Sequence, residues 1–117
     1  MPAGKYRINS LLDTATDPDD TELLAAPGAG YTAWIQWINV VVTTGQASSS
    51  INIEDGVGGS VLMGGASTAA GTTQYRFVYN EDDWGLPLTA NTAINATIAG
   101  ATGVVARVYG EVVVRGG

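Results

Sequence analysis

Most of the carboxylates of this chain gather in three short clusters, and calcium binding is the chemistry that such clusters could serve. The clusters lie at residues 13–22, 54–55 and 81–83. Calcium takes about six to eight oxygen ligands that converge on one point, and acidic loops can supply them. No cluster has EF-hand spacing, however, and acidic residues in turns are also the usual way to keep a loop solvated. Calcium at Glu81 to Asp83 is therefore only an alternative, and the sequence predicts no metal site and no cofactor.

The glycines of the stretch INIEDGVGGSVLMGG could form a loop that binds a phosphate group. Such a loop needs a helix N-terminus behind it, and a P-loop also needs a lysine. Here a strand pattern follows the glycines, and Val61 stands where the last glycine of G-x-G-x-x-G belongs. The stretch is therefore predicted to be a β-hairpin that turns at residues 54–59. The residues expected to point inward are Ile51, Ile53, Val61 and Met63.

The residue types of this chain do not favour an enzyme. Serines are frequent, but the chain has no His and no Cys, so the usual nucleophile–base pairs cannot be assembled. Lys5 is the only lysine that a Ser–Lys pair could use. Paired carboxylates hydrolyse glycosides in a cleft that raises the pKa of one acid, whereas the acids here fall in predicted exposed turns. We expect a protein that is not an enzyme.

Three tryptophans could contact a sugar ring or a protein surface. Trp34 and Trp37 have opposite parity within one predicted strand, so one is expected to point into the core and the other outward. Trp84 lies in the turn-rich segment NEDDWGLP and is the better candidate for either use. An outward tryptophan on a weakly charged surface more often marks a protein interface. The residues predicted to contact a partner are Tyr6 and Arg7 near the N-terminus and Asp82, Asp83 and Trp84 in the loop.

Composition limits the kind of partner. The 117 residues include 5 basic and 11 acidic ones, and the net charge of −6 argues against a nucleic-acid partner. Only 14% of the residues are charged, against about a quarter in a typical soluble domain, which suggests that partners cover part of the surface. No apolar run approaches the roughly 20 residues of a membrane span, and the first ten residues lack the apolar core of a signal peptide. We expect a soluble protein, made in the cytoplasm, without a membrane partner.

The hydrophobic pattern predicts about eight strands and no helix. The predicted strands cover residues 5–12, 21–26, 31–44, 49–54, 60–63, 73–80, 92–99 and 104–115. In the strand at 31–44 the apolar residues change parity, which predicts a bulge near Trp37 or a strand buried on both faces. Short strands that recur every 8 to 14 residues or so are typical of an antiparallel sandwich. The predicted fold is an all-β, jelly-roll-like sandwich.

One domain is expected, with an N-terminal part at 1–30 and a sandwich core at 31–117. The N-terminal part is predicted to be an arm and a hairpin that join the sandwich. Up to about Pro27 it carries few apolar residues, and it includes the polar stretch DTATDPDDTE. We therefore expect this segment to lie on a neighbouring subunit or on another partner, and to become ordered when it binds.

Several motifs follow one another in a fixed order. TELLAAPGAGYTAWIQWINVVVTTG is followed by INIEDGVGG, VLMGG, DDWGLPLTANTAINATIAG and ARVYGEVVV. This order resembles a group of small β-sandwich proteins of tailed bacteriophages, in which a polar hairpin and a proline–glycine turn precede a long apolar strand. The resemblance covers about residues 21–115. The very acidic DTATDPDDTE loop and the two tryptophans of the long strand depart from the pattern of the group.

The resemblance implies a virion protein of the head decoration (cement) type. Such a protein would bind the outer surface of the capsid, bridge neighbouring major capsid protein subunits, and form homotrimers or dimers. A tail or fibre component of the same fold is an alternative. A carbohydrate-binding module for host adhesion, using Trp84, is an alternative from a different class.

Overall fold

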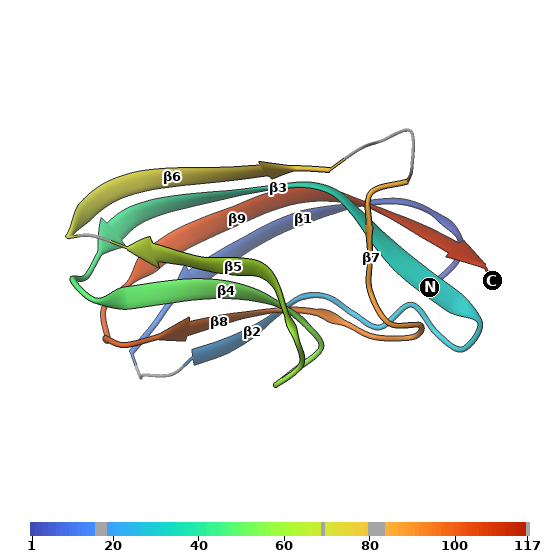
Figure 1. Ribbon diagram of the computed structural model, residues 1–117, viewed down its shortest axis with the longest axis horizontal. Helices are drawn as coiled ribbons and strands as arrows, with labels where there is room; N and C mark the ends of the chain where they lie inside the picture. The colour runs from blue at the N-terminus through green and yellow to red at the C-terminus, as the bar shows by residue number, and fades with distance from the viewer. Residues whose placement is uncertain (16–18, 69, 80–83, 117) are drawn as a thin grey trace.

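The computed structural model describes residues 1–15, 19–68, 70–79 and 84–116, and within them nine β-strands form two antiparallel sheets (Figure 1). Sheet A has the order β1-β9-β3-β6, with β7 also paired with β3, and sheet B has the order β2-β8-β4-β5. The strands are β1 Gly4–Asp13, β2 Asp19–Leu24, β3 Tyr31–Gly45, β4 Ser49–Asp55, β5 Val61–Thr68, β6 Gly71–Val78, β7 Leu86–Pro87, β8 Ile94–Ala99 and β9 Val105–Gly116. No helix in the described part of the chain is long and apolar enough to cross a membrane.

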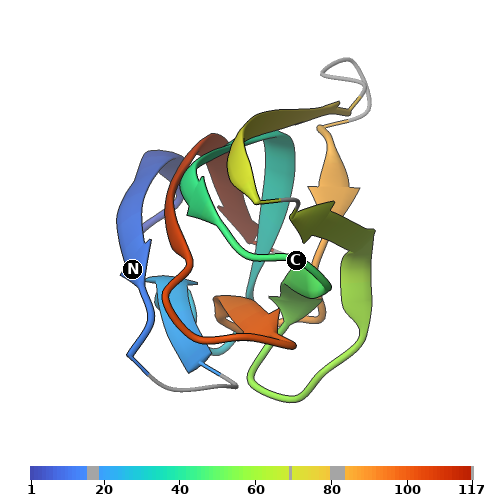
Figure 2. The same cartoon turned by 90° about the vertical axis from the view of Figure 1, so that its left-hand side faces the viewer.

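The strand pairing is that of a jelly roll. β4 pairs with β5, β3 with β6, β2 with β8 and β1 with β9, as in one long hairpin that has been rolled up. Rolling places alternate pairs in opposite sheets, and Figure 2 shows the strands around a common interior. The predicted jelly-roll sandwich is therefore confirmed. The additional strand, β7, has two residues and is too short to produce a sequence pattern.

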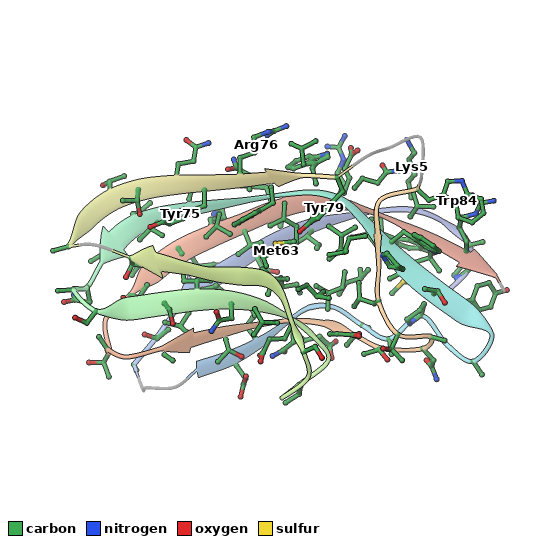
Figure 3. All side chains as sticks on the ribbon, in the orientation of Figure 1. Lys5, Met63, Tyr75, Arg76, Tyr79 and Trp84 are labelled. Atoms are coloured by element: carbon green, nitrogen blue, oxygen red, sulfur yellow. The ribbon has the colours of Figure 1, made fainter. Side chains whose placement is uncertain are left out.

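The core lies between the sheets and consists mainly of β-branched side chains, which pack well on pleated surfaces. It confirms the alternation predicted for the last two strands. The buried apolar residues of this region are Ile94, Ala96 and Ile98 in β8 and Val104, Ala106, Val108, Val112 and Val114 in and just before β9. Asn95, on the other side of β8, is buried as well, and its side-chain amide donates to Oδ1 of Asp20 over 3.3 Å. Figure 3 shows Met63 and Tyr75 between the sheets and Arg76 outside them.

The glycine-rich stretch is the β4–β5 hairpin, as predicted. Gly56 and Gly58 have φ angles of 82° and 69°, which residues with a side chain rarely adopt. Ile51, Ile53 and Met63 are buried. The inward placement of Val61 is wrong, because the pairing register shifts on both sides of Ile53 and leaves Val61 49% exposed.

The bulge predicted near Trp37 is present in β3. Ile35 lies opposite Val112 of β9, and Trp37 lies opposite the next residue, Glu111, so Gln36 is the extra residue. At the same point β3 exchanges one neighbour for another, because Trp37 pairs with β6 and Ile35 pairs with β7. The backbone N–H of Tyr79, just after β6, donates to the Gln36 carbonyl over 2.9 Å. Burial raises the pKa of the Tyr79 hydroxyl above its ordinary value of 10.0.

The N-terminal segment does not lie free of the sandwich. β1 pairs with β9 over ten residue pairs, from Gly4 to Asp13. Ile8, Leu12 and Leu23 are buried in the core. The expectation that this segment has too little apolar content to hold itself in place is therefore wrong: a few correctly spaced side chains and a full hydrogen-bonded ladder are enough. The boundary at residue 30 stays a prediction.

Two neighbouring leucines of β1 provide a test of this role. Leu12 is 1% exposed and Leu11 is 50% exposed on the opposite face. Leu12→Ala should lower the free energy of unfolding by about 2–5 kcal/mol, because it leaves a cavity in the core. Leu11→Ala should change it by no more than about 0.5 kcal/mol. Denaturant unfolding of the two variants measures both values, and equal effects would show that β1 is not part of the stable core.

Candidate interaction surface

The outer face of sheet A holds all the basic residues of the chain. The sequence has five lysines and arginines in total. In β1, β6 and β9 they occupy positions that alternate with core residues, so all five point away from the core. They are Lys5 and Arg7 in β1, Arg76 in β6, and Arg107 and Arg115 in β9.

The three tryptophans lie on the same face. The Gln36 bulge shifts the alternation of β3 by one residue, so Trp34 and Trp37 both point outward while Ile35 and Ile38 stay fully buried. The prediction that one of the two tryptophans points into the core is therefore wrong. The bulge itself was predicted, but its effect on the side chains after it was not.

Trp84 packs onto Trp34 from the loop that precedes β7. The two rings meet edge to face, with centroids 5.4 Å apart and an interplanar angle of 82°. The guanidinium carbon of Arg115 lies 3.0 Å from the centroid of the Trp84 ring, in a cation–π contact. Trp84 remains 44% exposed. Segments that are distant in the sequence therefore build one aromatic and basic cluster.

The backbone holds Trp84 in this place. Trp84 has a φ angle of 70°, which is uncommon for a residue with a bulky side chain, and Gly85 has a φ of 99°. A β-carbon on Gly85 would overlap the Ile35 carbonyl oxygen, directly before the bulge. Only glycine allows the loop to approach β3 so closely, and this approach presses Trp84 against Trp34.

A second cluster surrounds Trp37. The Arg76 guanidinium carbon lies 5.1 Å from the centroid of the Trp37 ring. Next to Trp37 is a hollow of about 190 Å³, whose lining includes Arg7, Tyr109 and Glu111. Nε of Arg7 lies 3.9 Å from Oε1 of Glu111, a long ion pair at a solvent-exposed arginine that adds little stability. Aromatic and arginine side chains therefore continue across the whole width of sheet A.

The outer face of sheet B has the opposite character. Its strands β2 and β4 present Asp20, Glu22 and Glu54 on the side away from the core. The Thr97 hydroxyl lies 2.7 Å from Oδ1 of Asp20, and it also contacts the Glu54 carboxylate. No group of three acidic residues in the described parts of the chain is arranged to hold a metal ion. The sandwich thus has one basic, aromatic face and one acidic face.

Asp55, the second acid of the glycine-rich hairpin, serves the fold. Its carboxylate accepts hydrogen bonds from the Thr89 backbone N–H, at 3.0 and 3.2 Å, and from the Thr89 hydroxyl, at 2.6 Å. These bonds join the β4–β5 turn to the segment between β7 and β8. The hairpin acid is therefore a structural bond acceptor.

The residues predicted to contact a partner are distributed unevenly. Arg7 and Trp84 lie on the outer face of sheet A. Tyr6 points to the other side of β1, packs against the core, and donates from its hydroxyl to the Pro2 carbonyl over 2.6 Å. Asp82 and Asp83, and with them the calcium position at Glu81 to Asp83, lie outside the described residues.

Four residues of this face were not predicted from the sequence, namely Arg76, Arg107, Tyr109 and Arg115, and of Trp34 and Trp37 only one was expected to point outward. A signal was present, because each basic residue has the parity opposite to that of its core-facing neighbours. The missing knowledge was which strands share a sheet.

Comparison of the sequence with protein-family models and with curated proteins finds no match. What the outer face of sheet A can do is therefore judged from its own residues. Tryptophan, tyrosine and arginine are the residue types enriched in protein interfaces and in their energetic hot spots. The face thus has the chemistry of a protein-binding surface.

Gly85 offers a test of how this surface is held in place. Gly85→Ala should be destabilising, because the added methyl group meets the Ile35 carbonyl and the φ of 99° is unfavourable for alanine. Gly30→Ala is the matched control, since Gly30 also has a positive φ, 84°, but has open space around it. The free energy of unfolding should fall by about 1–3 kcal/mol more in Gly85→Ala than in the control. Native tryptophan fluorescence should change only in Gly85→Ala, and equal behaviour of both variants would contradict this account of Trp84.

Proposed function

We propose that the protein is a non-enzymatic structural protein of a tailed-bacteriophage virion, specifically a capsid decoration (cement) protein. In this role it binds the outside of the head and stabilises contacts between major capsid protein subunits. The observation that carries the proposal is the outer face of sheet A, where all the basic residues and three tryptophans are presented by a rigid sandwich.

The fold and the sequence pattern both support this proposal. The jelly roll is common in viral capsid proteins, and also in lectins, so the fold by itself does not decide the function. The order of motifs from about residue 21 to 115 resembles phage sandwich proteins of the decoration type. A decoration protein needs a stable scaffold and an adhesive surface, and it needs no reactive group.

Such a protein attaches in many copies. Each contact is weak by itself, but copies joined as a homotrimer, or as a dimer, would bind several capsid subunits at once, and effective concentration then raises the overall affinity. The low share of charged residues, 14%, suits surfaces that are covered on the particle.

A carbohydrate-binding module is the second candidate, because Trp84 is exposed and jelly rolls also occur in lectins. Arg115 lies over the Trp84 ring at 3.0 Å and takes up one of the faces on which a sugar would stack. The decoration role is therefore favoured. Retention of the protein on immobilised glycans, lost in Trp84→Ala, would reverse this order.

Locating the protein in a reconstruction of the intact particle tests the proposal. We expect density of the size of this sandwich on the outside of the icosahedral shell, at positions between major capsid protein subunits. Particles that lack the protein should break at lower temperature or lower osmotic stress, and adding the purified protein should restore their resistance. Density on the tail or on fibres, with none on the shell, would replace the decoration role by the alternative of a tail or fibre component.

A further inference from the structure

We propose that the outer face of sheet A is the surface that docks, and that its partner is an acidic surface of the capsid shell. This inference rests on the proposed function and adds to it which side of the sandwich faces the shell and what chemistry receives it. Sheet B would then face away from the shell.

The charge distribution indicates an acidic partner. All five lysine and arginine side chains lie on the outer face of sheet A, although the side chains together carry a net charge of −6. Asp20, Glu22 and Glu54 lie on the opposite face. Complementary potentials steer association and select among partners, so a negative protein with one basic face binds acidic surfaces through that face.

Three of the four arginines of this face are held in place by contacts within the protein before any partner binds. Arg76 lies over Trp37, Arg115 lies over Trp84, and Nη1 of Arg107 donates to Oδ1 of Asn9 over 3.0 Å. Ordering a long side chain on association costs free energy, and a side chain that is already held loses less. A planar guanidinium fixed on an aromatic ring can still direct its N–H groups toward a carboxylate.

A second copy of this chain fits the face less well. The acidic surface lies on the opposite side of the same sandwich, so a contact between the two faces would repeat from copy to copy. Such head-to-tail contacts build open stacks unless the rotation closes a ring. A decoration protein needs a bounded assembly, which leaves the shell as the better source of acidic groups.

Nucleic acid fits less well too. Glu111 lies in the middle of the face, beside Arg7 and Trp37, and Asp13 lies at the end of β1 on the same side. A phosphate backbone would meet these carboxylates and the overall negative charge of the chain. A protein surface, on which acidic and basic groups are mixed, can match both signs.

The test uses the full-length protein and particles that lack it. The test variant is the double substitution Arg7→Gln/Arg76→Gln, called the face double. Both substitutions replace exposed side chains on the outer face of sheet A. The matched control is Ala47→Glu/Thr102→Glu, at exposed positions in the loops between β3 and β4 and between β8 and β9. Both doubles make the net charge more negative by two units, starting from −6. The face double removes two guanidinium groups from the outer face of sheet A, whereas the control adds two carboxylates away from that face, so the control tests whether the change in net charge alone weakens binding.

Binding is measured by co-sedimentation with the particles at low and at high salt, and folding is checked by thermal melting. We expect the face double to bind at least about tenfold more weakly than the wild type, and the control to stay within about twofold. Raising the salt should weaken the wild type more than the face double, because the pairs that salt screens are already removed.

The outcomes separate the two proposals. If the wild type does not bind the particles, both the decoration role and the docking face are wrong. If the wild type binds and the face double binds equally well, only the docking face is wrong. Sedimentation velocity of the free proteins adds a further arm: loss of an oligomer in the face double alone would make a second copy the occupant and overturn the capsid assignment.

Discussion

The bulge at Gln36 is the constraint on which the rest of the structure depends. A strand without a bulge places every second side chain on the same face, so Trp34 and Trp37 could not both be outside while Ile35 and Ile38 are both inside. One extra residue resolves this conflict, and the four side chains are placed accordingly. The long strand thus supplies core residues to the sandwich and, on its other side, two tryptophans to the surface.

The surroundings of the bulge are adapted to it. A β-carbon on Gly110 of β9 would lie 2.8 Å from the Trp37 carbonyl oxygen, so the partner strand needs a glycine there. Gly85 allows the loop before β7 to approach Ile35 on the other side. β6 ends and β7 begins where the bulge interrupts β3. Trp84 reaches Trp34 because Leu86 and Pro87, which follow it closely in the sequence, pair with β3 at Ile35 and Trp34.

The sequence was sufficient for those parts of the fold that alternation determines. Ile94, Ala96 and Ile98 revealed β8, and the change of parity near Trp37 revealed the bulge. The sequence was insufficient for those parts of the fold that depend on which strands pair and in which register. β7 forms only because Leu86 and Pro87 pass beside β3, and Val61 is exposed because the β4–β5 register shifts. The N-terminal segment has few apolar residues, and it is held in the sandwich by its hydrogen-bonded pairing with β9. The composition of the segment itself does not reveal this pairing.

The outer face of sheet A could be predicted from the sequence even less completely, because it depends on which strands are neighbours. Arg7, Arg76 and Arg107 are far apart in the sequence, and parity alone says that each points outward. Only the order β1-β9-β3-β6 shows that they point outward from the same sheet. For that reason the sequence analysis found Arg7 and Trp84 as isolated residues, whereas the structure joins them through Trp34, Trp37 and Arg115 into one surface.

Separation of charge across the sandwich also resolves an apparent conflict between the net charge of −6 and the acidic partner that we propose. Two packed sheets lie about 10 Å apart, and side chains extend outward from each. At physiological ionic strength the Debye length is only about 8 Å, so a partner at the outer face of sheet A is largely screened from carboxylates on the far side. Such a partner contacts the arginine side chains and the aromatic rings on which they pack. Net charge therefore describes how this protein behaves at a distance, whereas the alternation of its strands determines what it presents on contact.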